Sequence, residues 1–464
     1  MHQIFENLLP NLVLHWTGDF KGLDDGREDY IFAPTVWEAI GAATAKAGDS
    51  IPSAYGGRVP NIATNKHEMN ATERWSFWSL YIAPVLLRSR FSHIKYYRRF
   101  VRLVKCINLC LQFSLTRAEI DELEEEMVKW VLEYEKLYYQ GDLSRLSACP
   151  LTIHALLHIA ESIRQLGPVS GYWAFVMERF CYTFTRHPDV LSKRYLWPSM
   201  DRFITERAII TQIGLNYNCV DDLKLHKQLG LVAGAFECPE YSTCRLLPPK
   251  SSKPLSPGLM AAIAASFATR FNAKIAGPRA ALKKATITEY GKVKQIDSDA
   301  GDTMRSCGLG RITSDARDAT FVRYEAFIDR LARRANAKED LYLETFYGQL
   351  EHIFLVEFED MPSLRKLLEV KTSDPAPMIQ TRYVLAAIRM CVIENTPKEL
   401  NELDFHSYSS MGKLDVVDMT AVQCLVGRVP DGTGWVIIDR SGSLARATVQ
   451  DSDEPSDDDD DAAP

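Results

Sequence analysis

The sequence predicts an α+β protein, with a mostly helical amino-terminal part and a small antiparallel β barrel or sandwich near the carboxyl end. Two observations support this prediction. Through most of the first 225 residues, apolar side chains recur every three or four positions, which is the period of an α-helix. From residue 319 onward the period changes to two, which is typical of strands that bury one face.

The composition is that of a globular intracellular protein. Of the 464 residues, 46% are hydrophobic and 25% are charged, and the length is enough for roughly three domains. No apolar run approaches the ~18 residues of a membrane span, and the first 20 residues do not have the pattern of a signal peptide. The ten cysteines include no C-x-x-C pair, which favours reduced thiols over a zinc ribbon.

We expect the chain to be organised in four segments. These are a helical domain over 1–225, a basic and partly helical linker over 226–311, a β-rich accessory domain over 312–449 and a disordered acidic tail over 450–464. Residues 451–464 hold eight acids and no base, so the rest of the chain carries about +1 although the net charge is −7. Such a tail cannot bury enough apolar surface to offset the entropy cost of ordering it.

The helical domain begins with two helices around a turn. Ile4 and Leu8 lie on one face of the first helix, and Pro34 marks the start of the second. Residues 49–61 are rich in Gly, Pro and Ser and are expected to be a loop that wraps a surface. The clearest helix runs from Thr116 to Gly141. It begins with a capping box, and its buried stripe is Ile120, Leu123, Met127, Val131, Tyr134 and Tyr138.

A basic stretch over 88–105 is the first candidate for binding. It contains no acid, and four aromatic residues are interleaved with its cations, which suits a phosphate-binding surface with stacking platforms. The alternative is the solvated face of an amphipathic helix. The seven cations are Arg88, Arg90, Lys95, Arg98, Arg99, Arg102 and Lys105, and the aromatic residues are Phe91, Tyr96, Tyr97 and Phe100.

A second basic region lies between Lys250 and Lys294, where nine bases accompany a single acid, Glu289. Leu247–Pro257 has the Pro, Ser and Lys content of a linker, and Leu259–Ala285 is Ala-rich and helical in pattern. The region is interpreted either as a DNA-contacting linker or as a solubilising connector.

Five strand-like runs follow, separated by polar or Gly and Pro turns. They are TFVRYEAFIDR, TFYGQLEHIFLVEF, YVLAAIRMCVIE, DVVDMTAVQCLVGRV and GWVIIDRSG. Short strands at this spacing predict a strongly curved antiparallel barrel or sandwich, an architecture that often serves as a binding module.

The segment from Pro150 to Phe180 contains the candidate chemistry. Its apolar spacing predicts a helix that ends at Gly167-Pro168, after which Glu178 is set among aromatic residues. A second set, His154, His158 and Glu161, falls on one helix face at spacing that could hold a metal. The residue after His154 is alanine, so the general base of H-E-x-x-H is missing and helix-packing histidines are the favoured interpretation.

Two separated segments resemble a known family. LTIHALLHIAESIRQLGPVSGYWAFVMERF carries the pattern H…GPV…W-x-x-x-ERF/Y, and MHQIFENLLPNLVLHWTGDFKGLD resembles an Asp-x-Met-His-x-x-x-Glu-Asn segment. In this order they resemble the carboxyl-terminal half of the CACTA-type (En/Spm-like) DNA transposases of plants and fungi, in the transposase-2 family. SFWSLYIAPVLLRSRF and VVDMTAVQCLVGRV extend the resemblance over nearly the whole chain except the tail.

The resemblance implies a ribonuclease-H-like core in which three carboxylates hold two Mg²⁺ or Mn²⁺ ions for phosphodiester cleavage and strand transfer. Residues 1–225 would be the helical insertion and the terminal remnant of that core, and Glu178 has the chain order of the last carboxylate. His2, His154 and His158 would support it. The alternative is that Glu178 forms a structural salt bridge with a base such as Arg179 or Arg186. The resemblance also implies transposon-end DNA as partner and the nucleus as location.

The chain departs from the family at its start. In the fungal relatives an Asp precedes the Met-His pair, whereas this chain begins at Met1-His2, so the upstream carboxylates are absent. We therefore expect a remnant or fragment of a transposase that cannot cut DNA alone, with no metal or other cofactor of its own. The alternative is a non-catalytic DNA- or chromatin-binding protein that uses the stretch 88–105 and the β domain. Homo-oligomer formation and the partner of the β domain are left open.

Overall fold

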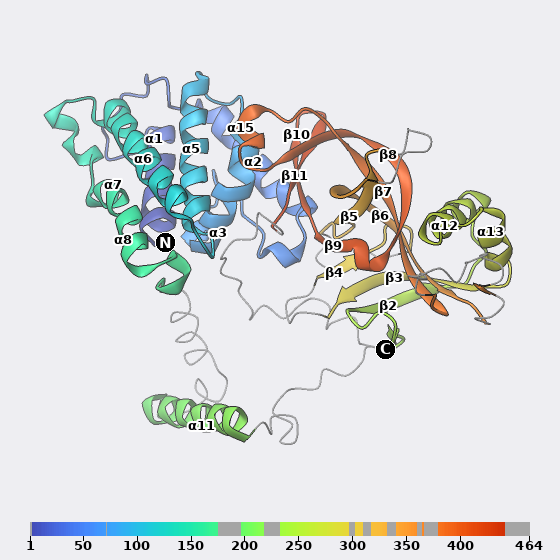
Figure 1. Cartoon of the computed structure of the whole chain (residues 1–464). Helices are drawn as coiled ribbons and strands as arrows, with labels where there is room; N and C mark the ends of the chain where they lie inside the picture. The colour runs from blue at the N-terminus through green and yellow to red at the C-terminus, as the bar shows by residue number, and fades with distance from the viewer. Residues whose placement is uncertain are drawn as a thin grey trace.

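The computed structural model describes residues 2–70, 72–174, 196–217, 233–296, 302–309, 317–331, 340–359, 364–365 and 379–440. Helices dominate the first half of the chain, and an antiparallel sheet with flanking helices forms most of the rest (Figure 1). The predicted α+β class is therefore confirmed.

The amino-terminal part is built from short helices with frequent π and 3₁₀ turns. Its elements are η1 (Gln3–Leu8), α1 (Leu9–Thr17), α2 (Pro34–Ala47), η2 (Gly48–Ser50), η3 (Ser53–Tyr55), η4 (Lys66–Asn70), α3 (Thr72–Phe77), η5 (Trp78–Ile82), α4 (Ala83–Leu86), α5 (Ile94–Cys110), α6 (Arg117–Tyr134), η6 (Glu135–Tyr139), η7 (Leu143–Ala148), α7 (Leu151–His154), η8 (Ala155–His158), α8 (Ile159–Leu166) and η9 (Val169–Gly171).

Several helix predictions are confirmed. The first 47 residues form two helical segments around a turn, and the Thr116 side chain and Glu119 make the predicted capping box. The whole predicted stripe of α6 and η6 is buried. The helix ends at Tyr139, because Gln140 takes a left-handed conformation with φ 62° one residue before Gly141.

The strands of the described residues all belong to one antiparallel sheet. Its strands are β1 (Phe236–Glu237), β2 (Cys244–Ser251), β3 (Thr286–Gln295), β4 (Thr303–Arg305), β5 (Phe321–Asp329), β6 (Leu341–Glu357), β7 (Arg382–Ile393), β8 (His406–Asp418), β9 (Val422–Leu425), β10 (Gly427–Asp431) and β11 (Gly434–Ile438). The order is β1-β2-β3-β6-β7-β8-β11-β10, with β4 beside β3 and β5 beside both β6 and β9.

The five predicted strand runs all correspond to strands of this sheet. Within the described residues, however, the pairing is an open path that ends at β1 and β10 and does not close into a ring. Closure into a barrel or sandwich therefore stays a prediction.

The region expected to be a linker contributes strands to the sheet. The linker prediction for Leu247–Pro257 is wrong for its first five residues, because Cys244–Ser251 form β2 and pair with β3. The register between these strands shifts between Leu247 and Lys250, so Pro248 and Pro249 sit at an irregularity where no ladder donor is required. The prolines that suggested a linker thus mark a bulge, while the division into separately folding domains stays a prediction.

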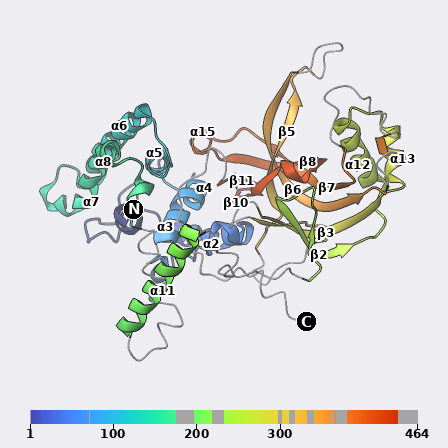
Figure 2. The same cartoon turned by 60° about the horizontal axis from the view of Figure 1, so that its bottom comes forward.

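Two helices in this region cover part of the sheet. Ser256 caps α12 (Pro257–Arg270), which is followed by α13 (Ala276–Leu282), so the predicted helical pattern is confirmed. Phe267 and Leu282 pack in one cluster with Phe354 and Tyr383 of β6 and β7. Figures 1 and 2 show both helices at the end of the sheet that is remote from the amino-terminal helices.

The opposite end of the sheet, at β10 and β11, packs into the helical core. Leu400 of α15 (Lys398–Asn401), Val429 of β10 and Val436 of β11 are buried in the same cluster as α1 and α2. The loop over 49–61 lies against these strands, where the Tyr55 hydroxyl donates to the Ile438 carbonyl at 2.8 Å. This contact confirms that the loop wraps a surface.

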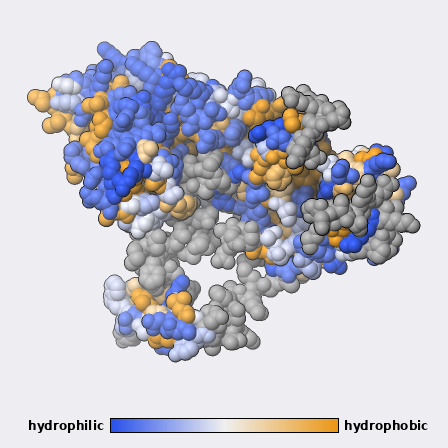
Figure 3. All heavy atoms as spheres, in the orientation of Figure 1, coloured by the Kyte–Doolittle hydropathy of each residue, from blue (hydrophilic) through white to orange (hydrophobic). Residues whose placement is uncertain are grey.

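Helix α11 (Leu196–Tyr217) lies between residues outside the described ranges. Most of its large apolar side chains are exposed, among them Trp197, Leu215 and Tyr217. Figure 3 shows the hydrophobic surface that this helix presents. No helix in the described part of the chain is both long and apolar enough to span a bilayer.

Candidate functional site

The candidate acid Glu178 lies outside the described residues, as do Arg179 and Arg186. Its catalytic and structural interpretations therefore both stay predictions. The structure describes the segment before it, where the single predicted helix is divided into α7, the 3₁₀ turn η8 and α8. Gly167 ends α8 with φ 85°, in agreement with the predicted stop.

The start of the chain packs against α7. Gln3 Nε2 donates to the Thr152 carbonyl at 3.0 Å, although 149 residues separate them. In the same turn, His2 Nδ1 lies 2.7 Å from Glu6 Oε2, and Thr72 donates to the Glu6 carboxylate. Burial raises the pKa of Glu6, but the hydrogen bonds from Thr72 and His2 outweigh it and hold that pKa below its usual range. The described parts of the two segments that carry the family resemblance are thus neighbours in space (Figure 1).

The two histidines of α7 and η8 face each other at the surface. Their Nε2 atoms are 3.1 Å apart, and both side chains are exposed. Glu161 accepts a hydrogen bond from Gln165 at 2.7 Å and lies 3.5 Å from Arg164. In the described ranges, no three His, Cys, Asp or Glu side chains are grouped so that they could hold a metal. These residues alone therefore do not fit a two-metal centre.

The aromatic residues of the basic stretch are not available for stacking. Tyr96, Tyr97 and Phe100 of α5 are buried in the helical core, and Phe91 is half-buried. The Tyr97 hydroxyl donates to the Pro84 carbonyl at 2.7 Å, which fixes that ring inside the protein. The prediction of stacking platforms is therefore wrong, because the rings of Tyr96, Tyr97 and Phe100 lie on the buried apolar face of α5.

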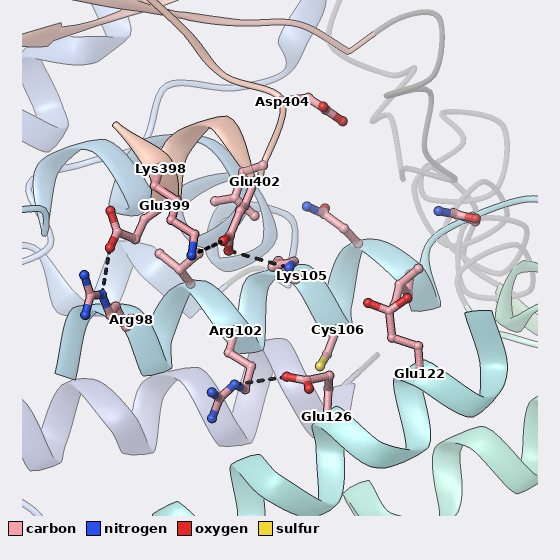
Figure 4. A pocket seen from close by; sticks show the side chains of 15 residues that line it. Arg98, Arg102, Lys105, Cys106, Glu122, Glu126, Lys398, Glu399, Glu402 and Asp404 are labelled. Carbon is pink, nitrogen blue, oxygen red and sulfur yellow. Dashed lines mark hydrogen bonds and ion pairs between the residues drawn. The ribbon is translucent and has the colours of Figure 1, made fainter. Parts of the chain in front are cut away.

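Most cations of the stretch are already paired. Arg98 Nε lies 2.8 Å from Glu399 Oε1, and Lys105 Nζ lies 3.6 Å from Glu402, so α15 neutralises two of them (Figure 4). The other pairs are Arg88 with Asp431 at 2.8 Å and Arg102 with Glu126 at 3.0 Å and Glu133 at 2.6 Å. None of these acids is in the stretch itself, which is why the sequence pattern did not reveal them.

The remaining three cations differ from one another. Arg99 is buried among aromatic rings, with Cζ 4.7 Å from the centre of Trp130. Arg90 and Lys95 are exposed, and no ion pair to either is found among the described residues. Only two of the seven predicted contacts are therefore exposed without a paired acid in the described structure.

A groove of about 380 Å³ lies between α5, α6 and α15 (Figure 4). Its lining alternates in charge, with Arg102 and Lys105 beside Glu126 and Glu402. Cys106 also lines it, and burial raises the pKa of this thiol to about 12, so it is protonated at neutral pH. Acids along the groove oppose a phosphate ligand, and a protonated thiol is a poor nucleophile.

Comparison with models of protein families, with curated proteins and with solved structures finds no match for this chain.

Proposed function

We propose that this chain derives from a CACTA-type DNA transposase, that it acts in the nucleus on transposon-end DNA, and that Glu178 is the last carboxylate of the ancestral catalytic centre. The observation that supports this most is the packing of η1 against α7, with the hydrogen bond from Gln3 to Thr152. A ribonuclease-H-like centre gathers its acids from distant segments. The family pattern places one acid just before the Met-His pair and another after α8, so both segments must lie together.

Under the same proposal, we expect that this chain cannot cleave DNA by itself. Two-metal phosphoryl transfer requires several carboxylates around the Mg²⁺ or Mn²⁺ ions. The described residues hold no such group, and Glu178 is the one candidate that the resemblance identifies. The expected result is therefore that purified chain leaves supercoiled plasmid intact in Mg²⁺ or Mn²⁺. Cleavage that disappears in Glu178→Gln would contradict this incompetence.

A crosslinking experiment tests the ancestral site directly. In a variant with His2→Cys and Glu178→Cys, a short bis-maleimide should join the two positions, identified as one crosslinked peptide by mass spectrometry. The control pair is His2→Cys with Arg279→Cys, because α13 lies at the remote end of the sheet (Figures 1 and 2). A folded variant that gives no crosslink between positions 2 and 178 would contradict the proposal.

The finer architecture is also part of the proposal. Residues 1–225 would be the helical insertion and terminal remnant of the ribonuclease-H-like core. The β region would be a barrel or sandwich that binds a partner, which is supported by β5 because this strand pairs with both β6 and β9.

The alternative function, a non-catalytic DNA- or chromatin-binding protein, has less support at the stretch 88–105. Four of its cations are ion-paired and Arg99 is buried, so little positive charge is free to contact phosphates.

A further inference from the structure

We propose that the outer face of α12 and α13, together with the chain at the end of β2, binds the phosphate backbone of double-stranded DNA through charge. We call this surface the basic end face. The choice of DNA as the polyanion rests on the proposed function, whereas the charge arrangement does not depend on it. Its six cations are Lys250, Lys253, Lys274, Arg279, Lys283 and Lys284, all of them exposed.

The basic end face has no acids of its own. Residues 250–288 contain no Asp or Glu, and Glu289 is turned to His352, whose Nδ1 lies 2.6 Å from its carboxylate. Across the described ranges, no ion pair involves any of the six cations, in contrast to the four paired cations of the stretch 88–105. The seventh base of the region, Arg270, is bound to Asp418 of β8 and is not counted.

The fold brings the six cations to one end of the sheet. Lys250 of β2 stands opposite Tyr290 of β3, so the chain that continues to Lys253 runs beside the start of β3. Lys283 and Lys284 lie just before that start, at the end of α13. The apolar sides of both helices pack against the sheet, so their opposite sides face solvent.

The surface chemistry favours a duplex backbone over bases or single strands. The outer side of α12 carries small exposed residues that allow close approach of a phosphate backbone, namely Gly258, Ala261, Ala265 and Thr269. The hydroxyl group of Thr269 can also donate to a phosphate oxygen. The nearby Phe271 is buried against the sheet, and no exposed aromatic ring is found among residues 250–288. Single-strand binding normally uses such rings as stacking platforms.

The experiment is fluorescence anisotropy of the full chain with a labelled duplex of arbitrary sequence, at salt concentrations from about 50 to 200 mM. The test variant is Arg279→Gln, Lys283→Gln, Lys284→Gln. Each lost phosphate contact lowers the slope of log K against log salt by about 0.9, so the slope should fall by about 2 to 3. The matched control is Arg90→Gln, Lys95→Gln, which removes the two exposed cations of the stretch 88–105 and should leave the slope nearly unchanged.

Several results would overturn the proposal. These are no binding of the full chain at low salt, an unchanged slope in the test variant, loss of binding in the control variant, or tighter binding of single strands than of the duplex. Binding that appears only after Asp457–Asp461 are replaced by asparagine would also overturn it, because the acidic tail would then be the occupant of the basic end face. Failure here is distinguishable from failure of the proposed function, since the crosslink tests the position of Glu178 and not the charge of α13.

Discussion

The guanidinium of Arg99 lies over the indole of Trp130, with Cζ 4.7 Å from the ring centre. The rings of Tyr138 and Tyr134 lie 5.1 and 5.4 Å from the same carbon. Nε and Nη2 of Arg99 are buried without a hydrogen-bond partner among the described residues. Burial lowers the pKa of Arg99, whereas the Glu133 carboxylate and a hydrogen bond with Tyr138 favour its charged form. The faces of three aromatic rings add to this stabilisation of the buried charge.

This arrangement predicts an order of stability for two variants. Arg99→Lys keeps the buried charge but loses the planar group that stacks on the rings, whereas Arg99→Met removes the charge and keeps a flexible apolar side chain. We expect the lysine variant to lose at least about 2 kcal/mol more unfolding free energy than the methionine variant, since an unpaired buried charge is the costlier defect. Urea denaturation followed by tryptophan fluorescence measures both. A methionine variant less stable than the lysine variant would show that the rings stabilise a compact ammonium as well, and would contradict the requirement for a planar guanidinium.

His15 contacts the same aromatic group, since its ring is stacked on that of Tyr138 with 4.0 Å between the ring centres. The Tyr134 hydroxyl donates to the Ala148 carbonyl at 2.8 Å, so His15 Nε2, at 3.0 Å from that hydroxyl, acts as a donor to it. Burial lowers the pKa of His15 to about 3, although Asp24 acts in the opposite direction. The folded protein therefore holds His15 neutral, with Nδ1 unprotonated.

The lowered pKa predicts acid sensitivity. Between the ordinary pKa of about 6.5 and the folded value of about 3, the unfolded chain binds a proton that the folded protein does not, so stability falls as pH falls. From pH 7 to pH 5 this group should cost about 2 kcal/mol of unfolding free energy. His15→Gln, whose amide can still donate to Tyr134, should lose less stability over the same range in urea denaturation. Equal losses in both proteins would show that His15 is not the titrating group.

The local elements could be predicted from sequence because their signals are local. The capping box at Thr116, the stripe of α6 and the apolar runs of β5 and β7 each depend on neighbours a few residues away. The strand β2 was missed because adjacent prolines usually exclude a strand, and only the bulge against β3 reveals how they fit.

The candidate site depended on partners that are distant in sequence. The cations at positions 98 and 105 looked free because Glu399 and Glu402 come about 300 residues later, on α15. The same distance hid the contact of Gln3 with Thr152. Composition alone could identify the basic excess after Lys250, since that region has almost no acids for its bases to meet.

The exposed histidine pair predicts a result for metal removal. His154 and His158 offer two nitrogen ligands, and Glu161 is engaged by Gln165 and Arg164. A structural zinc site needs four ligands, so we expect EDTA to leave the melting temperature of the purified chain unchanged. Elemental analysis of the same sample should find no stoichiometric zinc. A decrease in melting temperature with EDTA that is absent in His158→Ala would establish a metal site there.

The last strands share a core with the helical part, which predicts which elements a cavity in that core will destabilise. Val429 of β10 is fully buried in the cluster formed with the amino-terminal helices, while Val293 of β3 is fully buried in a separate cluster of the sheet. Each valine-to-alanine change should cost about 2 kcal/mol. In hydrogen exchange, Val429→Ala should lower the protection of amides in α2, which contacts β10, more than that of amides in β2. Val293→Ala should do the reverse, because Val293 is paired with Leu246 of β2. If both variants lowered amide protection equally in α2 and in β2, the two cores would open as one unit. That result would contradict the assignment of β10 to the helical core.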